Sequence, residues 1–73
     1  MKRETAEKLK ELMERITREV DDSIRYVMEN EPQEEFFRYR KLAGMPLGYI
    51  YLDILQPIYD EYPDLTPPGL RKE

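Results

Sequence analysis

The stretch from Leu42 to Tyr62 places the strongest constraint on how this 73-residue chain can fold. Wound as a helix at about 100° per residue, it has one broad face of apolar and small residues, namely Phe36, Phe37, Ala43, Gly44, Leu47, Gly48, Ile50, Tyr51, Ile54, Leu55, Ile58 and Tyr62. The opposite side carries a second apolar set, Leu42, Met45, Tyr49 and Leu52, interrupted by Asp53, Gln56 and Asp60. A helix that is apolar on nearly every side is normally buried on nearly every side. One neighbouring helix cannot supply that cover.

Residues 4–31 are predicted to form a single long helix. Its apolar residues recur at intervals of three and four, at Leu9, Met13, Ile16, Val20, Ile24 and Val27. Charged side chains occupy most of the remaining surface, so the apolar stripe is about as narrow as the contact line of a coiled coil. This helix can therefore cover only one side of its neighbour.

The segment Glu29–Pro32 is predicted to be the turn between two helices. Pro32 suits the first position of a helix, where its missing N–H has no partner in any case. Asn30 or Glu31 can cap this second helix, which we expect over residues 32–62. Two long helices joined by a short connection pack as an antiparallel hairpin, so we predict an all-α fold in one domain, residues 1–73.

Gly44, Pro46 and Pro57 make the second helix irregular. Each proline lacks the N–H that an α-helix needs in its interior, and it bends or breaks the helix. We expect a kink near Gly44–Pro46, because the apolar face stays in phase across it; the alternative is that Gly44 ends one helix and Pro46 begins the next. Gly44 and Gly48 share a face and would let another helix approach closely, so a bulky residue at Gly48 is expected to be costly.

The last segment, residues 63–73, is expected to be an extended, proline-rich tail, because Pro67–Pro68 favours polyproline II. Leu65 and Leu70 are its apolar residues. Three arrangements stay open: the two leucines pack back on the helices, the tail is disordered, or it docks on another protein. We favour the first.

Size and composition favour a partner chain. A single domain of 73 residues is marginal as a monomer, and small scaffolds usually rely on disulfides, a metal or a second chain. The sequence has no cysteine and no histidine, so we expect no disulfide, metal site or cofactor. The prediction is a homodimeric four-helix bundle with the second helix central, joined through Leu42, Met45, Tyr49, Leu52, Gly44 and Gly48.

The charge pattern limits the partners further. The net charge is −4, and no segment is basic enough to form the broad positive surface that duplex nucleic acid favours. Every apolar run is far shorter than the about 20 residues of a membrane span. The first residues lack the apolar segment of a secretory signal, so a cytoplasmic location is expected.

No catalytic constellation is evident in the sequence. Without histidine or cysteine, the commonest general base, the thiol nucleophile and the usual triads are absent. Ser23 is the only serine, and we interpret it as a small polar residue at a helix contact. Carboxylates are numerous but mostly fall on solvated faces of the helical wheel. We therefore predict that the chain is not an enzyme.

One basic and aromatic cluster, residues 36–41, supports a second hypothesis. Arg38, Arg40 and Lys41 could hold phosphates while the aromatic rings stack on bases, as in a small nucleic-acid-associated regulator. The negative net charge argues against it, and an amphipathic helix produces the same pattern. Arg40 falls among apolar neighbours, and we expect it to extend toward a carboxylate or to solvent across an interface.

The function class predicted from the sequence is a non-enzymatic protein interaction or scaffold module that acts as a small homodimer. Its protein partner would bind the charged surface of residues 4–31 or the tail.

Overall fold

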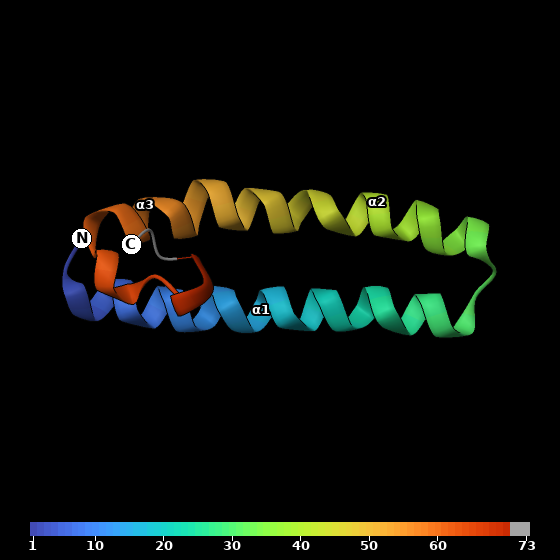
Figure 1. Ribbon diagram of the computed structural model, residues 1–73, viewed down its shortest axis with the longest axis horizontal. Helices are drawn as coiled ribbons and strands as arrows, with labels where there is room; N and C mark the ends of the chain where they lie inside the picture. The colour runs from blue at the N-terminus through green and yellow to red at the C-terminus, as the bar shows by residue number, and fades with distance from the viewer. Residues whose placement is uncertain (71–73) are drawn as a thin grey trace.

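The chain folds into a long helical hairpin (Figure 1). The computed structural model describes residues 1–70. Within that range, every regular element is helical: α1 Arg3–Asn30, α2 Gln33–Tyr49, the π-helix η1 Ile50–Leu55, α3 Gln56–Glu61, and the short 3-10 helices η2 Pro63–Leu65 and η3 Pro68–Leu70. The run α2–η1–α3 lies antiparallel beside α1. The all-α hairpin predicted from the sequence is confirmed, with helix ends within one residue of the predicted ones.

The turn between the helices is as short as predicted, but its capping differs. The side-chain nitrogen of Asn30 donates a hydrogen bond to the Tyr26 carbonyl (2.8 Å), and the Glu31 backbone N–H donates to the Val27 carbonyl (2.9 Å). Both bonds satisfy carbonyls at the end of α1 rather than donors at the start of α2. Pro32 is the residue before α2, which begins at Gln33.

The second helix continues through Gly44–Pro46, which contradicts the alternative that Gly44 ends one helix and Pro46 begins the next. Pro46 lies inside α2, which continues to Tyr49. The departure from α-helical geometry comes immediately afterwards, in η1, where the backbone N–H of Gln56 donates to the carbonyl of Tyr51, five residues earlier. This π segment was not predicted from the sequence.

The π segment changes which side chains face α1. A π turn takes more residues than an α turn, so side chains beyond it are rotated relative to a uniform 100° wheel. Tyr59 becomes buried, although the uniform wheel did not place it on the core face, whereas Ile54 and Tyr51, expected in the core, are each more than a third exposed. Leu55 and Ile58 are buried as predicted.

The core lies at the end of the hairpin farthest from the turn. The buried residues of the described chain are Ala6, Leu55, Ile58 and Tyr59, and those packed around them are Leu9, Met13, Ile50, Tyr62 and Leu65. Ala6 is fully covered, and its small side chain lets the chain around Ile58 approach α1 closely. The hairpin is therefore closed most firmly where the tail begins.

The tail up to residue 70 is not extended, which corrects the prediction. The Leu65 and Thr66 N–H groups donate to the carbonyls of Tyr62 and Pro63, and Leu70 donates to Pro67, which closes η2 and η3. The tail folds back over α1 (Figure 1), and Leu65 packs against the core. Leu70 remains half exposed. The remaining tail residues, 71–73, lie outside the described part of the chain.

No helix among residues 1–70 is both long enough and apolar enough to cross a membrane.

Replacing Ile58 by alanine should lower the free energy of unfolding by about 2–5 kcal/mol, because it removes a side chain only 2% exposed at the centre of the core. Met28→Ala, at a half-exposed position on α1, is the matched control, with an expected loss below about 1 kcal/mol. Urea denaturation of both variants at one protein concentration would measure the difference. Equal losses would show that the core does not lie where the structure places it.

Candidate protein interaction surface

The side of the second helical run (α2, η1 and α3) turned away from α1 carries four large apolar side chains that no part of residues 1–70 covers. These residues, the outer stripe, are between 57% and 64% exposed: Leu42, Met45, Tyr49 and Leu52. Their spacing of three, four and three places them in one line along the helix. An uncovered row of this length is typical of a contact surface rather than of isolated surface residues.

Gly44 and Gly48 open a shallow depression in the same face. Its volume is about 300 Å³, and its lining consists of Gly44, Met45, Gly48, Tyr49, Leu52 and Asp53. A Cβ atom added at either glycine would meet nothing within 4 Å. The close helix contact predicted at Gly48 therefore does not occur within residues 1–70, and a larger residue there would cost packing only if another molecule lay on the stripe.

The inner face of α2 is itself covered incompletely. Phe36, Ala43 and Leu47 are partly buried against α1, and no residue of α2 is fully buried. One polar contact joins the helices here: the Ser23 hydroxyl lies 2.8 Å from the Tyr39 hydroxyl and 2.6 Å from the Val20 carbonyl. Since Ser23 donates to that carbonyl, Tyr39 donates to Ser23. Ser23 is thus a helix-contact residue, as predicted.

The chain exposes more surface than a compact domain of the same size would. The chain exposes 5859 Å², whereas a compact monomer of 8.9 kDa would expose about 4,800 Å². Its radius of gyration is 14.6 Å, against about 11 Å for a compact domain of this length. The excess of about 1,000 Å² is close to the roughly 800 Å² that each partner buries in a standard protein interface.

The basic and aromatic cluster is largely engaged within the chain. Arg38 pairs with Glu35 at 2.8 Å. The Arg40 guanidinium lies over the rings of Phe36 and Phe37, 5.3 Å from each centroid. Arg40 is exposed, so of the two predicted directions, toward a carboxylate or toward solvent, it takes the second. Phe37 was predicted to face the core, but it is nearly half exposed. These contacts support the amphipathic-helix interpretation of the cluster.

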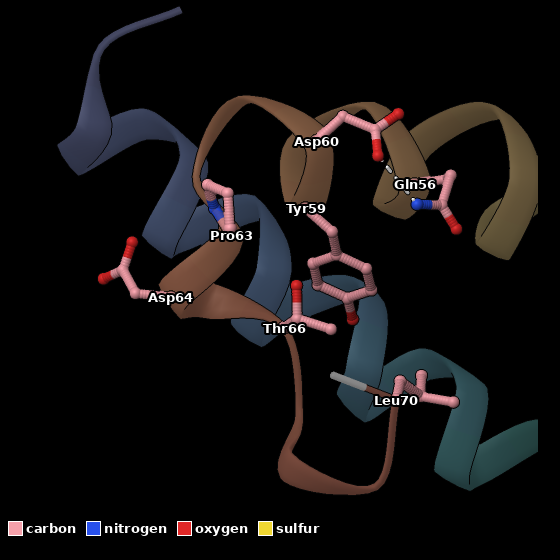
Figure 2. A pocket seen from close by; sticks show the side chains of 7 residues that line it. All are labelled: Gln56, Tyr59, Asp60, Pro63, Asp64, Thr66 and Leu70. Atoms are coloured by element: carbon pink, nitrogen blue, oxygen red, sulfur yellow. Dashed lines mark hydrogen bonds between the residues drawn. The ribbon is translucent and has the colours of Figure 1, made fainter. Parts of the chain in front are cut away.

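A second depression lies where the tail folds over α3 (Figure 2). Its volume is about 490 Å³, and its lining residues are Gln56, Tyr59, Asp60, Pro63, Asp64, Thr66 and Leu70. Figure 2 shows the carboxylates of Asp60 and Asp64 pointing away from each other. Asp60 accepts a hydrogen bond from Gln56 (3.0 Å), and Asp64 is paired with Arg3. Two acids that diverge in this way do not form the converging carboxylate pair that most glycoside hydrolases use.

Tyr59 connects this depression to the core and to α1. Its hydroxyl donates to the Glu14 carboxylate across 3.2 Å, while Lys10 binds the other oxygen of Glu14 at 2.9 Å. Burial, together with the neighbouring negative charge of Glu14, raises the pKa of Tyr59 to about 12. The neutral hydroxyl is therefore the stable form, and it acts as a structural donor.

Polar contacts also hold the start of the chain against the tail. The terminal amine of Met1 lies 2.9 Å from Glu61, and its hydrogen bond lowers the pKa of that carboxyl. The Tyr62 hydroxyl donates to the Met1 carbonyl at 2.5 Å, and partial burial raises the pKa of Tyr62. The hydrogen bond with Asp64 raises the pKa of Arg3. These contacts close the end of the hairpin that lies farthest from the turn.

Among residues 1–70, no group of three or more acidic, histidine or cysteine side chains is placed to hold a metal ion. Comparison of the chain with protein-family models, with curated proteins and with solved structures finds no match. The uncovered outer stripe is the feature of residues 1–70 that best fits a binding site.

Sequence reasoning found the outer stripe but missed part of its surroundings. All four stripe residues were named from the helical wheel, and the structure brings them together on one face. Asp53, which lines the depression with Gly44 and Gly48, was seen only as an interruption of the apolar set. Its position four residues after Tyr49 was the signal that it borders the stripe.

Raising the pH from 10 to 12 should reduce stability, and Tyr59→Phe should reduce the size of that loss. In the folded state the pKa of Tyr59 is about 12, while a tyrosine in the unfolded chain has its ordinary pKa of about 10. The contribution of protonated Tyr59 to the free energy of unfolding is therefore complete below pH 10 and is lost as the pH rises toward 12. Urea denaturation across this range would measure it.

Glu14→Gln is the control for that measurement, because it keeps an acceptor for Tyr59 but removes the charge. It should make the loss at high pH smaller than in the parent chain. Tyr62 contributes to the same loss, so the difference between parent and variant is the quantity to compare. An identical pH profile for the parent and Tyr59→Phe would contradict the assignment.

Proposed function

We propose that this chain is a non-enzymatic protein interaction module that acts in the cytoplasm as a small helical homodimer, with a second copy lying on the outer stripe. The observation that carries the proposal is the row of four uncovered apolar side chains on α2 and the first turn of η1. In a four-helix bundle, α2 of each copy would be central, and each α1 would lie outside.

The amount of open surface supports a second copy as the occupant. The excess exposed area matches what one partner contributes to a standard interface. A contact between two copies would also bury apolar surface that a single hairpin leaves open, because no residue of α2 is fully buried within one chain. Covering the stripe would give α2 apolar neighbours on both sides.

Such a module would act by presenting binding surfaces to a partner in a fixed arrangement. The dimer would fix two copies of the charged outer surface of α1 and two folded tails in a set geometry, for a protein partner to bind. The divergent carboxylates of the tail depression are consistent with a role that involves no catalysis. The nucleic-acid alternative draws little support, since Arg38 and Arg40 are occupied by contacts within the chain.

Leu52→Glu and Tyr49→Glu should each convert the dimer to a monomer of 8.9 kDa. Each places two charges in the apolar contact and removes the burial of two side chains, worth roughly 1.5–3 kcal/mol apiece, so the dissociation constant should rise at least about a hundredfold. Sedimentation equilibrium at micromolar concentrations would measure it.

Tyr26→Glu is the matched control, because Tyr26 is 68% exposed on α1 and Leu52 is 64% exposed on the second helical run. It should leave the dimer intact. A parent chain that sediments as a monomer up to about 100 μM would reject the proposal, and so would dissociation of the dimer by Tyr26→Glu as complete as by Leu52→Glu.

A further inference from the structure

The outer stripe is bordered by opposite charges at its two ends. Lys41 directly precedes the stripe, while Asp53 directly follows it. Both residues are exposed. Two such faces attract each other when they run in opposite directions, and they repel when they run in the same direction.

The same face is also self-complementary in shape. The depression at Gly44 and Gly48 lies beside the projecting side chains of Met45, Tyr49 and Leu52. A two-fold axis perpendicular to the helix would bring the projecting side chains of each copy toward the depression of the other. A hollow and projections on one surface are what a contact between identical chains requires.

We infer that a second copy of the chain lies antiparallel on this face, with the two-fold axis passing close to residue 47. This inference rests on the proposed function, because it takes the homodimer as given. Three pairs of residues support the register, since each pair is centred on position 47: Lys41 with Asp53, Leu42 with Leu52, and Met45 with Tyr49. A single register of the two helices therefore pairs the opposite charges and the apolar residues at the same time.

A parallel two-fold arrangement does not pair the opposite charges. It would place Lys41 beside Lys41 and Asp53 beside Asp53 at the borders of the same apolar contact. It would also bring both turns to one end of the bundle and both tails to the other. In the antiparallel dimer, the tail of each copy lies beside the turn of the other.

Disulfide cross-linking distinguishes the two arrangements, because the chain contains no cysteine of its own. Leu42→Cys and Leu52→Cys would be prepared separately, and also unfolded and refolded as a mixture, before mild oxidation. In the antiparallel dimer, position 42 of one copy lies about 15 Å along the axis from position 42 of the other, by the rise of an α-helix. A disulfide needs Cα atoms within about 7 Å.

We therefore expect a covalent dimer from the mixture and little from either variant alone. Cross-linking of each variant alone, but not between the two in the mixture, would overturn the antiparallel inference and leave the homodimer standing. If the parent chain is a dimer by sedimentation but no sample of the cysteine variants cross-links, the register is overturned as well. A parent chain that is monomeric by sedimentation would instead reject the proposed function, so the two failures are distinguishable.

A charge exchange gives an independent measurement. Lys41→Glu and Asp53→Lys should each raise the dimer dissociation constant roughly two- to tenfold at low salt, because each places like charges opposite each other. The double variant should return close to the parent value. Lys8→Glu, at an exposed position on α1, is the control and should have little effect. A double variant weaker than both single variants would contradict the pairing.

Discussion

The packing of Ile58 and Tyr59 around Ala6 is the contact on which the hairpin depends. It joins the last turns of the second helical run to the first turns of α1, and it lies at the opposite end from the connecting turn. The chain is thus held at both ends, covalently by the turn and through apolar packing by this cluster. The long segment between them needs only moderate cover to stay aligned, and the half-buried inner face of α2 provides that.

The π segment sets the position of this cluster. Without the extra residue in its turns, Tyr59 would rotate away from α1, and its hydrogen bond to Glu14 could not form. π segments inside helices often occur at functional positions. In this chain the segment carries both Leu52 of the outer stripe and Leu55 of the core, so it fixes how the exposed face of α2 is oriented relative to the buried face of α3.

Much of the hairpin could be predicted from the sequence because its signals are local. The spacing of Leu9 to Val27 defines α1, and Pro32 defines the turn. The outer stripe was also accessible, since α2 is regular up to Tyr49. The burial of Tyr59 was not predictable from a uniform wheel, because the phase change depends on hydrogen bonds that sequence spacing does not report. The helical turns of the tail likewise depend on Leu65 finding the core.

Uneven burial also has a consequence for the motion of the chain. The cover is densest around Ile58 and thinnest toward the connecting turn, where no residue of α2 is fully buried. Local opening costs least where apolar contacts are few. In a single chain, backbone amides near Gln33 would exchange with solvent sooner than those near Ile58. The two helices would separate first beside the connecting turn and last at the end where the tail packs.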